Sequence, residues 1–125
     1  IFLDMNGLKE VNDQLGHDVG DGLLRRVGSV LTQAIQNTTY TASRIGGDEF
    51  VILMPGTDET AVLVMLQTIQ ELFNIDNQYY SSQPISMSFG SATTLENESI
   101  EAMLKRADQQ MYQRKKHFYQ DKEAS

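Results

Sequence analysis

The sequence predicts an α+β fold in which one sheet is covered by helices. Hydrophobic patterns typical of strands and helices follow one another in the order β-α-α-β-β-α-β-α, without an internal repeat. The pair Gly46-Gly47 separates two adjacent strand-like runs and indicates a hairpin, because glycine supplies the positive φ angles of a tight turn. An antiparallel hairpin among several helices is typical of this fold class.

The first half of the chain predicts one strand and two helices. Residues 1–5 form a short apolar run consistent with a buried strand, which Gly7 ends. A short helix is expected over residues 8–15, and Gly16 stops it. Apolar residues then recur at helical spacing from 19 to 36, which predicts the second and longer helix.

The middle of the chain predicts the hairpin and a third helix. Residues 40–45 and 49–54 are the two strand-like runs. Thr57 is the expected N-cap of the helix that follows, with acidic residues in its first turn. Residues 74–83 are expected to be a polar loop, with at most a weak strand around Tyr79.

The end of the chain predicts one more strand and helix. Residues 84–92 alternate apolar and polar side chains, and the apolar stripe of the last helix runs from Ile100 to Met111. The 125 residues are the length of one domain with one core. Because the chain opens on Ile1-Phe2-Leu3, typical of a strand interior, we expect residues 1–125 to be a domain cut from a longer chain.

Composition excludes several classes of function. The net charge of −7 argues against a general nucleic-acid binder, and the absence of cysteine excludes disulfides and cysteine-ligated zinc. No apolar run approaches the roughly 20 residues that span a bilayer, so no membrane insertion by this segment is expected. An acidic protein that binds a triphosphate must neutralise it locally, with a metal ion and a few lysines.

Asp4 is the first candidate functional residue, because it ends an apolar strand where a structural role favours an aliphatic side chain. A carboxylate at this point suits a hard cation such as Mg²⁺. The bend at Gly7 leaves backbone N–H groups of the next helix free to bind phosphate oxygens. The alternative is an aspartate that caps the following helix, and Asp4 alone favours that alternative.

Residues 16–21 form a polar turn with an acidic helix start, which is a common structural feature. In a functional interpretation, Asp21 and Asn12 hold a base. A carboxylate accepts hydrogen bonds from the N1–H and the exocyclic amine of guanine, and adenine lacks both donors there. His17 alone is more typical of a structural hydrogen-bonding residue than of a catalyst.

Asp48 and Glu49 stand at the tip of the predicted hairpin, where two carboxylates repel each other and do nothing for the turn. A solvated acidic turn is the structural alternative. Against it, the flanking residues are apolar, so the tip is carried on buried strands. Rigid strands are suitable supports for metal ligands.

Together these segments resemble the GGDEF family of diguanylate cyclases, which takes its name from the pentapeptide at residues 46–50. Further blocks of the resemblance are Asp4-Met5-Asn6-Gly7-Leu8-Lys9, Asn12-Asp13, Gly16-His17, Gly20-Asp21, Ala107-Asp108, Met111-Tyr112 and Lys115. The resemblance spans residues 1 to about 116. It implies a palm-like fold, similar to adenylyl cyclases and ferredoxin-like domains, with an antiparallel-rich central sheet flanked by helices.

The resemblance also implies an activity, the condensation of two GTP into cyclic dimeric GMP with release of pyrophosphate. Asp4, the Met5 carbonyl, Asp48 and Glu49 would hold Mg²⁺, for which Mn²⁺ could substitute. Asp48 would also help to deprotonate the attacking 3′-hydroxyl, and Lys115 would join it and Glu49 in the catalytic set.

The same resemblance assigns the substrate-binding residues. Asn12 and Asp21 would bind guanine, with His17 supporting the nucleotide. The phosphates would meet the backbone around Leu8 and the side chains of Lys9 and Lys115. One GTP per domain implies a homodimer for turnover, and the family implies an upstream sensory domain and a cytoplasmic location, with a parent protein that could be membrane-anchored.

Lys115 has two interpretations without the resemblance. It lies four residues after Met111 and therefore continues the buried stripe of the last helix. Alternatively, residues 115–117 place positive charge near the negative end of that helix dipole. The resemblance favours the first interpretation.

The chain departs from the family pattern at several positions. Asn6 and Gly7 stand where many members have aspartate and a bulky residue, and Tyr119 stands where a phosphate-binding arginine is expected. The product-binding Arg-x-x-Asp motif would fall on Asn37 and Tyr40 and is absent, so no product feedback through that site is expected. The family's upstream Asp-x-Leu-Thr segment also lies outside this sequence.

Two rival functions remain open at this point. One is a catalytically silent GTP-binding regulatory module, which Tyr119 in place of arginine favours weakly. Intact Asp4, Asp48 and Glu49 argue against it. The other is a plain α+β interaction domain, in which the carboxylates would have no function.

Overall fold

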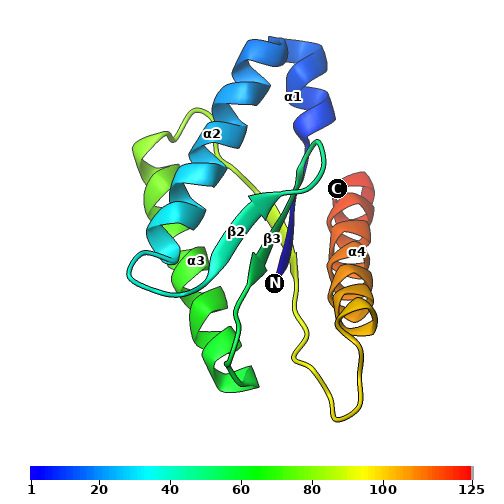
Figure 1. The fold of residues 1–125 in the computed structure, drawn as a ribbon. Coiled ribbons are helices and arrows are strands. Elements are labelled where there is room, and N and C mark those ends of the chain that lie inside the picture. Colours follow the sequence, from blue (N-terminus) through cyan, green and yellow to red (C-terminus); the bar gives the residue numbers. More distant parts are fainter. Residues whose placement is uncertain (125) are drawn as a thin grey trace.

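The computed structural model describes residues 1–124, with side chains as far as Asp121, and has the predicted order of elements (Figure 1). The elements are β1 (Phe2–Met5), α1 (Leu8–Leu15), α2 (His17–Ala34), β2 (Thr41–Arg44), β3 (Glu49–Leu53), α3 (Glu59–Tyr79), β4 (Met87–Gly90) and α4 (Ile100–Ala124).

The four strands form one sheet in the order β2-β3-β1-β4, and every neighbouring pair is antiparallel. The predicted hairpin at Gly46-Gly47 is confirmed as the connection between β2 and β3, although neither glycine has the positive φ angle that was expected. β1 lies between β3 and β4, with Asp4 opposite Glu49 on one side and opposite Ser88 on the other. This register decides which side chains share a face of the sheet.

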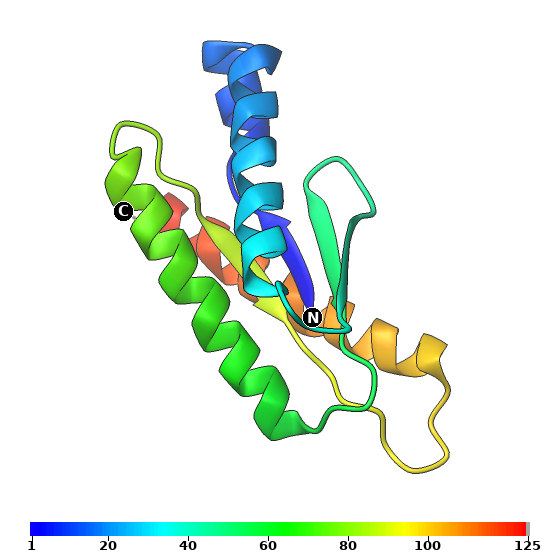
Figure 2. The same cartoon turned by 60° about the vertical axis from the view of Figure 1, so that its left-hand side comes forward.

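The two faces of the sheet carry different helices, α2 and α3 on one side and α4 on the other (Figures 1 and 2). Alternation along β1 sends Leu3 and Met5 into the main core with α2 and α3, and Phe2 toward Ala107 and Met111 of α4. Asp4 is two residues after Phe2, so its side chain points to the same face of the sheet as Phe2, the face that α4 covers. The side chains most deeply buried in the main core are Leu3, Met5, Val27, Leu31, Ile52 and Ile69.

α4 lies unusually close to β4 at Gly90. A Cβ atom built on Gly90 would lie 2.0 Å from the carbonyl oxygen of Ala107 and 2.4 Å from the backbone nitrogen of Met111. Since no larger residue has room there, this glycine sets the distance between helix and sheet. It thereby fixes the helix that carries Lys115.

The predicted polar loop over residues 74–83 is wrong for residues 74–79, because α3 continues through Tyr79, and it is confirmed for residues 80–83. Polar side chains of its last turns are used in tertiary contacts, which a sequence pattern does not reveal. Asn77 donates to the carbonyl of Ile85 at 2.8 Å and accepts from the Ile85 N–H at 2.7 Å. No strand forms around Tyr79 within the described residues.

Several predicted boundaries also shift. The N-cap of α3 is Asp58, whose carboxylate accepts from the N–H of Ala61 at 2.9 Å, and not Thr57, whose hydroxyl donates to the carbonyl of Met54. α2 begins at His17 rather than at residue 19. The strands are shorter than the apolar runs that predicted them. Among the described helices, none combines the length and apolarity needed to cross a membrane.

Arg26 fastens α2 to the end of α3. Its guanidinium bonds Asp76 at 2.7 Å and the carbonyl of Gln83 at 2.7 Å, and it lies over the ring of Tyr80, 4.5 Å from the centroid. The side chains of Arg26 and Asp76 are only 13% and 17% exposed, so the pair is partly desolvated.

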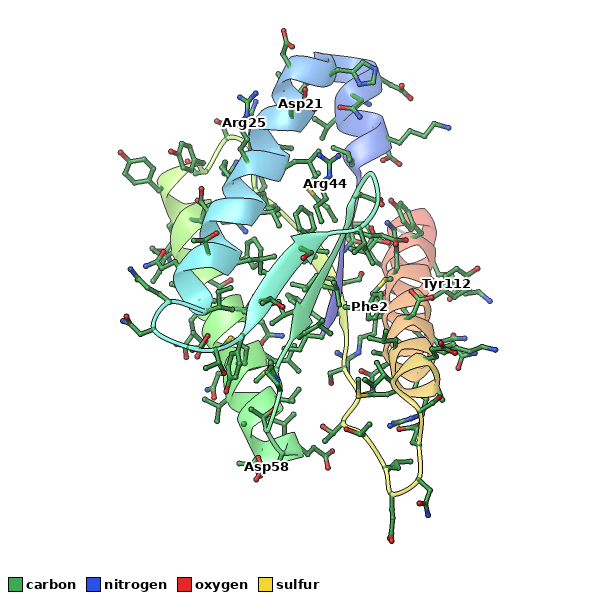
Figure 3. The ribbon with its side chains drawn as sticks, viewed as in Figure 1. Phe2, Asp21, Arg25, Arg44, Asp58 and Tyr112 are labelled. Atoms are coloured by element: carbon green, nitrogen blue, oxygen red, sulfur yellow. The ribbon has the colours of Figure 1, made fainter. Side chains whose placement is uncertain are left out.

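We expect Arg26→Ala to lower the free energy of unfolding by about 2 kcal/mol, because it breaks charge-assisted bonds and leaves Asp76 without its partner. Urea denaturation measures this loss. Arg25→Ala is the matched control, since Arg25 is an exposed arginine of the same helix (Figure 3). Equal stability of the two variants would show that the Arg26 contacts contribute nothing.

Candidate active site

Three carboxylates meet where the end of β1 lies beside the hairpin tip. Asp4 and Glu49 are register partners across β1 and β3, so their side chains stand on the same face of the sheet. Asp48 precedes Glu49 at the turn. Oxygen atoms of Asp4, Asp48 and Glu49 all lie within 4.8 Å of one another. The structure therefore brings together the acidic residues that the sequence predicted would meet.

The backbone around these carboxylates is held by hydrogen bonds. The N–H of Met5 donates to the carbonyl of Asp48 at 2.9 Å, which ties the end of β1 to the hairpin. At the tip, the guanidinium of Arg44 donates to the carbonyls of Gly46 and Gly47 at 3.0 and 2.7 Å (Figure 3). The turn is thus braced from both ends, as a set of metal ligands requires.

Asn6, directly after β1, is a buried polar residue whose role the sequence did not reveal. It accepts from the hydroxyl of Ser88 at 2.9 Å and donates to the hydroxyl of Ser86 at 3.1 Å, while its own N–H donates to the carbonyl of Ser86. These bonds satisfy the side chain and fix the bend that follows Asp4. The two serines at alternate positions of an apolar run were the available signal.

Lys115 reaches this cluster from α4. Its Nζ lies 2.8 Å from Oδ1 of Asp4 and 2.9 Å from Oδ2 of Asp48, and it donates to the carbonyl of Met5 at 3.3 Å. The helix-dipole interpretation of Lys115 fails, because α4 continues to Ala124, more than two turns further. Lys115 does continue the stripe that ends at Met111, and its ammonium group lies in the site. There it contacts the carboxylates of Asp4 and Asp48, and its expected contact with phosphates stays a prediction.

The charges of this group depend on one another. Burial raises the pKa of Asp4 to about 6, although the adjacent Lys115 acts in the opposite direction. Burial also acts to raise the pKa of Asp48, but the hydrogen bonds from Lys115 and Asp4 and the charge of Lys115 outweigh it and lower that pKa. Burial acts to lower the pKa of Lys115, but its two carboxylate partners outweigh burial, so the pKa of Lys115 is raised. Asp48 is therefore anionic and Lys115 cationic near neutral pH.

The donor set fits a hard divalent cation. Carboxylate oxygens from Asp4, Asp48 and Glu49, with the carbonyl of Met5 beside them, are the ligand type that Mg²⁺ and Mn²⁺ take in proteins. Oδ1 of Asp4 is buried, and within residues 1–124 it receives no hydrogen bond of good geometry despite the nearby ammonium. A buried carboxylate oxygen that lacks a well-aligned hydrogen bond is suited to a metal ion.

The residues predicted to bind the base form a second group on the α1–α2 hairpin, which extends beyond the end of the sheet (Figure 2). Asn12 of α1 is half-buried against α2, whereas His17 and Asp21 of α2 are exposed. Lys9 is exposed on α1, and Leu8 is buried beneath it. Figure 3 shows Asp21 near the free end of this hairpin.

Tyr119 makes a contact that the sequence did not predict. Its hydroxyl accepts a hydrogen bond from the N–H of Gly7 at 3.1 Å, across 112 residues of chain. Gly7 has φ 78° and is the N-cap of α1, so this N–H is one of the donors predicted to bind phosphate. A groove of about 410 Å³ beside it is lined by Tyr112, Lys115, Lys116, Tyr119 and Gln120.

A second pocket of similar size, about 400 Å³, lies on the sheet end away from the carboxylates. Its walls include Phe2, Leu53 and Ile100, and the described residues that line it contribute no charged side chain. It therefore offers none of the groups that metal binding or proton transfer requires.

Comparison with known proteins identifies the family. The family model described as "Diguanylate cyclase, GGDEF domain" matches residues 1–120. The chain is 34% identical over 115 residues to the diguanylate cyclase DgcS of Shewanella oneidensis, a match that covers 92% of this chain and 38% of DgcS. The chain thus spans well under two-thirds of the length of that relative.

Solved structures agree with this assignment. The active GGEEF domain of a diguanylate cyclase from Vibrio cholerae superimposes with a TM-score of 0.80 at 26% identity, covering 93% of this chain and 74% of that one. The GGDEF domain of DgcB from Caulobacter crescentus, solved in complex with c-di-GMP, gives 0.77 at 28% identity, covering 93% and 70%. The palm-like α+β fold is confirmed, and the chain belongs to the GGDEF domain family.

Proposed function

We propose that this domain is a diguanylate cyclase, which condenses two GTP into cyclic dimeric GMP and releases pyrophosphate. One observation carries the proposal: Asp4, Asp48 and Glu49 converge within 4.8 Å of one another at the end of a rigid sheet, facing Lys115. Relatives named diguanylate cyclases and the DgcB complex with c-di-GMP support it.

In the proposed reaction, the 3′-hydroxyl of one GTP attacks the α-phosphate of another. A new P–O bond forms, and the bond from that phosphorus to the pyrophosphate group breaks. Asp48, which is anionic near neutral pH, would take the hydroxyl proton. Asp4, Glu49 and the carbonyl of Met5 complete the ligand set for Mg²⁺. When bound, Mg²⁺ would lower the pKa of the hydroxyl and neutralise the triphosphate.

Lys115 supplies the mobile positive charge of the site. Its raised pKa keeps the ammonium protonated. Its flexible stem lets the group leave the carboxylates and follow the phosphates when a metal–nucleotide complex enters. In this proposal the Lys115 ammonium neutralises the carboxylates before the metal–nucleotide complex enters. Once the complex is bound, the ammonium stabilises the developing negative charge on the phosphates.

The guanine base would be read on the α1–α2 hairpin. Asn12 and Asp21 offer acceptors for the N1–H and the exocyclic amine, with His17 beside them and Lys9 available to the phosphates. Because one such site holds one GTP, turnover requires two domains that face each other. A homodimer, and an upstream sensory domain in the same chain, therefore belong to the proposal.

The test uses the full-length protein with GTP and Mg²⁺, and mass spectrometry of the products. We expect c-di-GMP and pyrophosphate, and neither when EDTA removes the metal. The rival function is a silent GTP-binding module. One structural observation favours it: the N–H of Gly7 already donates to the hydroxyl of Tyr119. GTP binding by calorimetry without product from the assembled dimer would establish that rival.

Tyr119 gives a separate prediction, because its hydroxyl and a phosphate oxygen would compete for one backbone N–H. Tyr119→Phe keeps the ring and frees the N–H of Gly7, so we expect the KM for GTP to fall about three- to fivefold, the effect of one neutral hydrogen bond. Tyr112→Phe, an exposed tyrosine of the same groove, is the control (Figure 3). A raised KM for Tyr119→Phe would instead show that the hydroxyl helps to bind the nucleotide.

A further inference from the structure

α1 and α2 touch most closely at Gly20. A Cβ atom built on this buried glycine would lie 1.9 Å from Oδ1 of Asn12, 3.0 Å from its Cγ and 3.2 Å from Cδ1 of Leu8. Gly20 stands inside a helix and lacks a positive φ angle, so the backbone does not require glycine there. The Asn12 carboxamide requires glycine at position 20, because it lies in the space that a methyl group would fill.

The other glycines of α2 show that this requirement is local. A Cβ atom on Gly22 or Gly28 would meet no described atom within 4 Å apart from neighbouring residues and backbone of its own helix. All three residues lie in the same helix, where glycine is a poorer helix former than alanine. Helix propensity therefore gives no reason for glycine at position 20, whereas the contact with Asn12 does.

We propose that Gly20 is a positioning residue for base recognition: it provides the space that holds the Asn12 carboxamide beside Asp21. This inference rests on the proposed function, in which Asn12 and Asp21 bind guanine. Gly20 directly precedes Asp21 in α2. The same turn of this helix therefore carries the Asp21 carboxylate and leaves the space that the Asn12 carboxamide occupies. The residue acts through Asn12 and does not itself touch the nucleotide.

A methyl group at this position displaces the side chain before it disturbs the fold. Oδ1 of Asn12 is the far end of a rotatable side chain, and the next neighbour, Cδ1 of Leu8, is also a side-chain end. Both can move without a shift of either helix. Gly20→Ala should therefore alter nucleotide recognition more than stability.

The test measures GTP and inosine triphosphate binding by calorimetry with Mg²⁺ in the full-length protein. Inosine triphosphate keeps the N1–H of guanine and lacks its exocyclic amine. We assign the exocyclic amine to the Asn12 carboxamide oxygen, so we expect Gly20→Ala to weaken GTP binding about tenfold, the effect of one misplaced polar partner, and to weaken inosine triphosphate binding less. Gly22→Ala is the matched control and should bind both nucleotides as the unchanged protein does.

A double-mutant cycle separates the possible failures. Asn12→Ala should weaken GTP binding, and adding Gly20→Ala to it should cause no further loss. If Asn12→Ala leaves GTP affinity unchanged, the proposed base-binding role fails and the inference falls with it. If Asn12→Ala weakens binding but Gly20→Ala matches Gly22→Ala, only the role of Gly20 is overturned. Equal losses from Gly20→Ala with and without the Asn12 side chain would also overturn it.

Thermal unfolding of the same four proteins tests the contact without any nucleotide. If the methyl group meets the Asn12 carboxamide, alanine at position 20 should be tolerated better once that side chain is removed. A melting temperature that falls equally in both backgrounds would show that the two residues do not share this space.

Discussion

Asp48→Asn is expected to lower the rate of pyrophosphate release from GTP by a thousandfold or more, on the order of the loss when a principal charge-stabilising group is removed. The change removes a proposed metal ligand and the proposed base, and it removes the carboxylate that lies 2.9 Å from the Lys115 ammonium. The fold should persist, because the carbonyl of Asp48, not its side chain, accepts the bond from Met5. Circular dichroism and thermal melting measure that second expectation.

Asp108→Asn is the control for this experiment. Asp108 is an exposed aspartate on α4, so its replacement makes the same chemical change outside the carboxylate cluster. It should retain full turnover. If the Asp48 variant also kept its rate while folded, the assignment of the catalytic group would be wrong.

Gly90→Ala is expected to lower the free energy of unfolding by about 3 kcal/mol, at the upper end of ordinary overpacking losses. The added methyl group would meet backbone atoms, the carbonyl of Ala107 and the nitrogen of Met111, which cannot rotate away. α4 must therefore move as a whole. Since Lys115 lies one turn beyond Met111, its ammonium would leave the carboxylates, and turnover should fall together with stability.

Urea denaturation and pyrophosphate release on the same preparation measure both effects of Gly90→Ala. Gly28→Ala is the comparison, because a methyl group there meets no described atom within 4 Å and alanine favours the helix. It should be at least as stable as the unchanged protein. A Gly90 variant of undiminished stability would mean that α4 does not rest on β4 as described.

Local pattern was sufficient for the order of elements and for the hairpin, because both depend on residues close in sequence. It also indicated that Lys115 continues the stripe of Met111. It could not show that Asp4 faces Glu49, since that requires knowing that β1 pairs with β3. The resemblance to the family, not periodicity, joined those carboxylates in the prediction.

The missed features all depend on contacts between distant segments. The end of α3 is polar in sequence, yet it is held by Arg26 from α2 and by the backbone of Ile85. The bond from Gly7 to Tyr119 spans 112 residues. Nothing in a helical pattern distinguishes Gly20 from Gly22; only the neighbouring α1 does. In each case tertiary contacts decided the outcome, and single-sequence propensity does not contain them.

The proposed reaction depends on one divalent ion held by Asp4, Asp48 and Glu49 at the end of β1. An anomalous difference map from crystals grown with Mn²⁺ and a non-hydrolysable GTP analogue measures this directly. The predicted result is a manganese peak bonded to oxygens of all three carboxylates, with Lys115 turned toward the phosphates. Bound nucleotide with no manganese peak among these side chains, or with the peak elsewhere, would rule out this metal site.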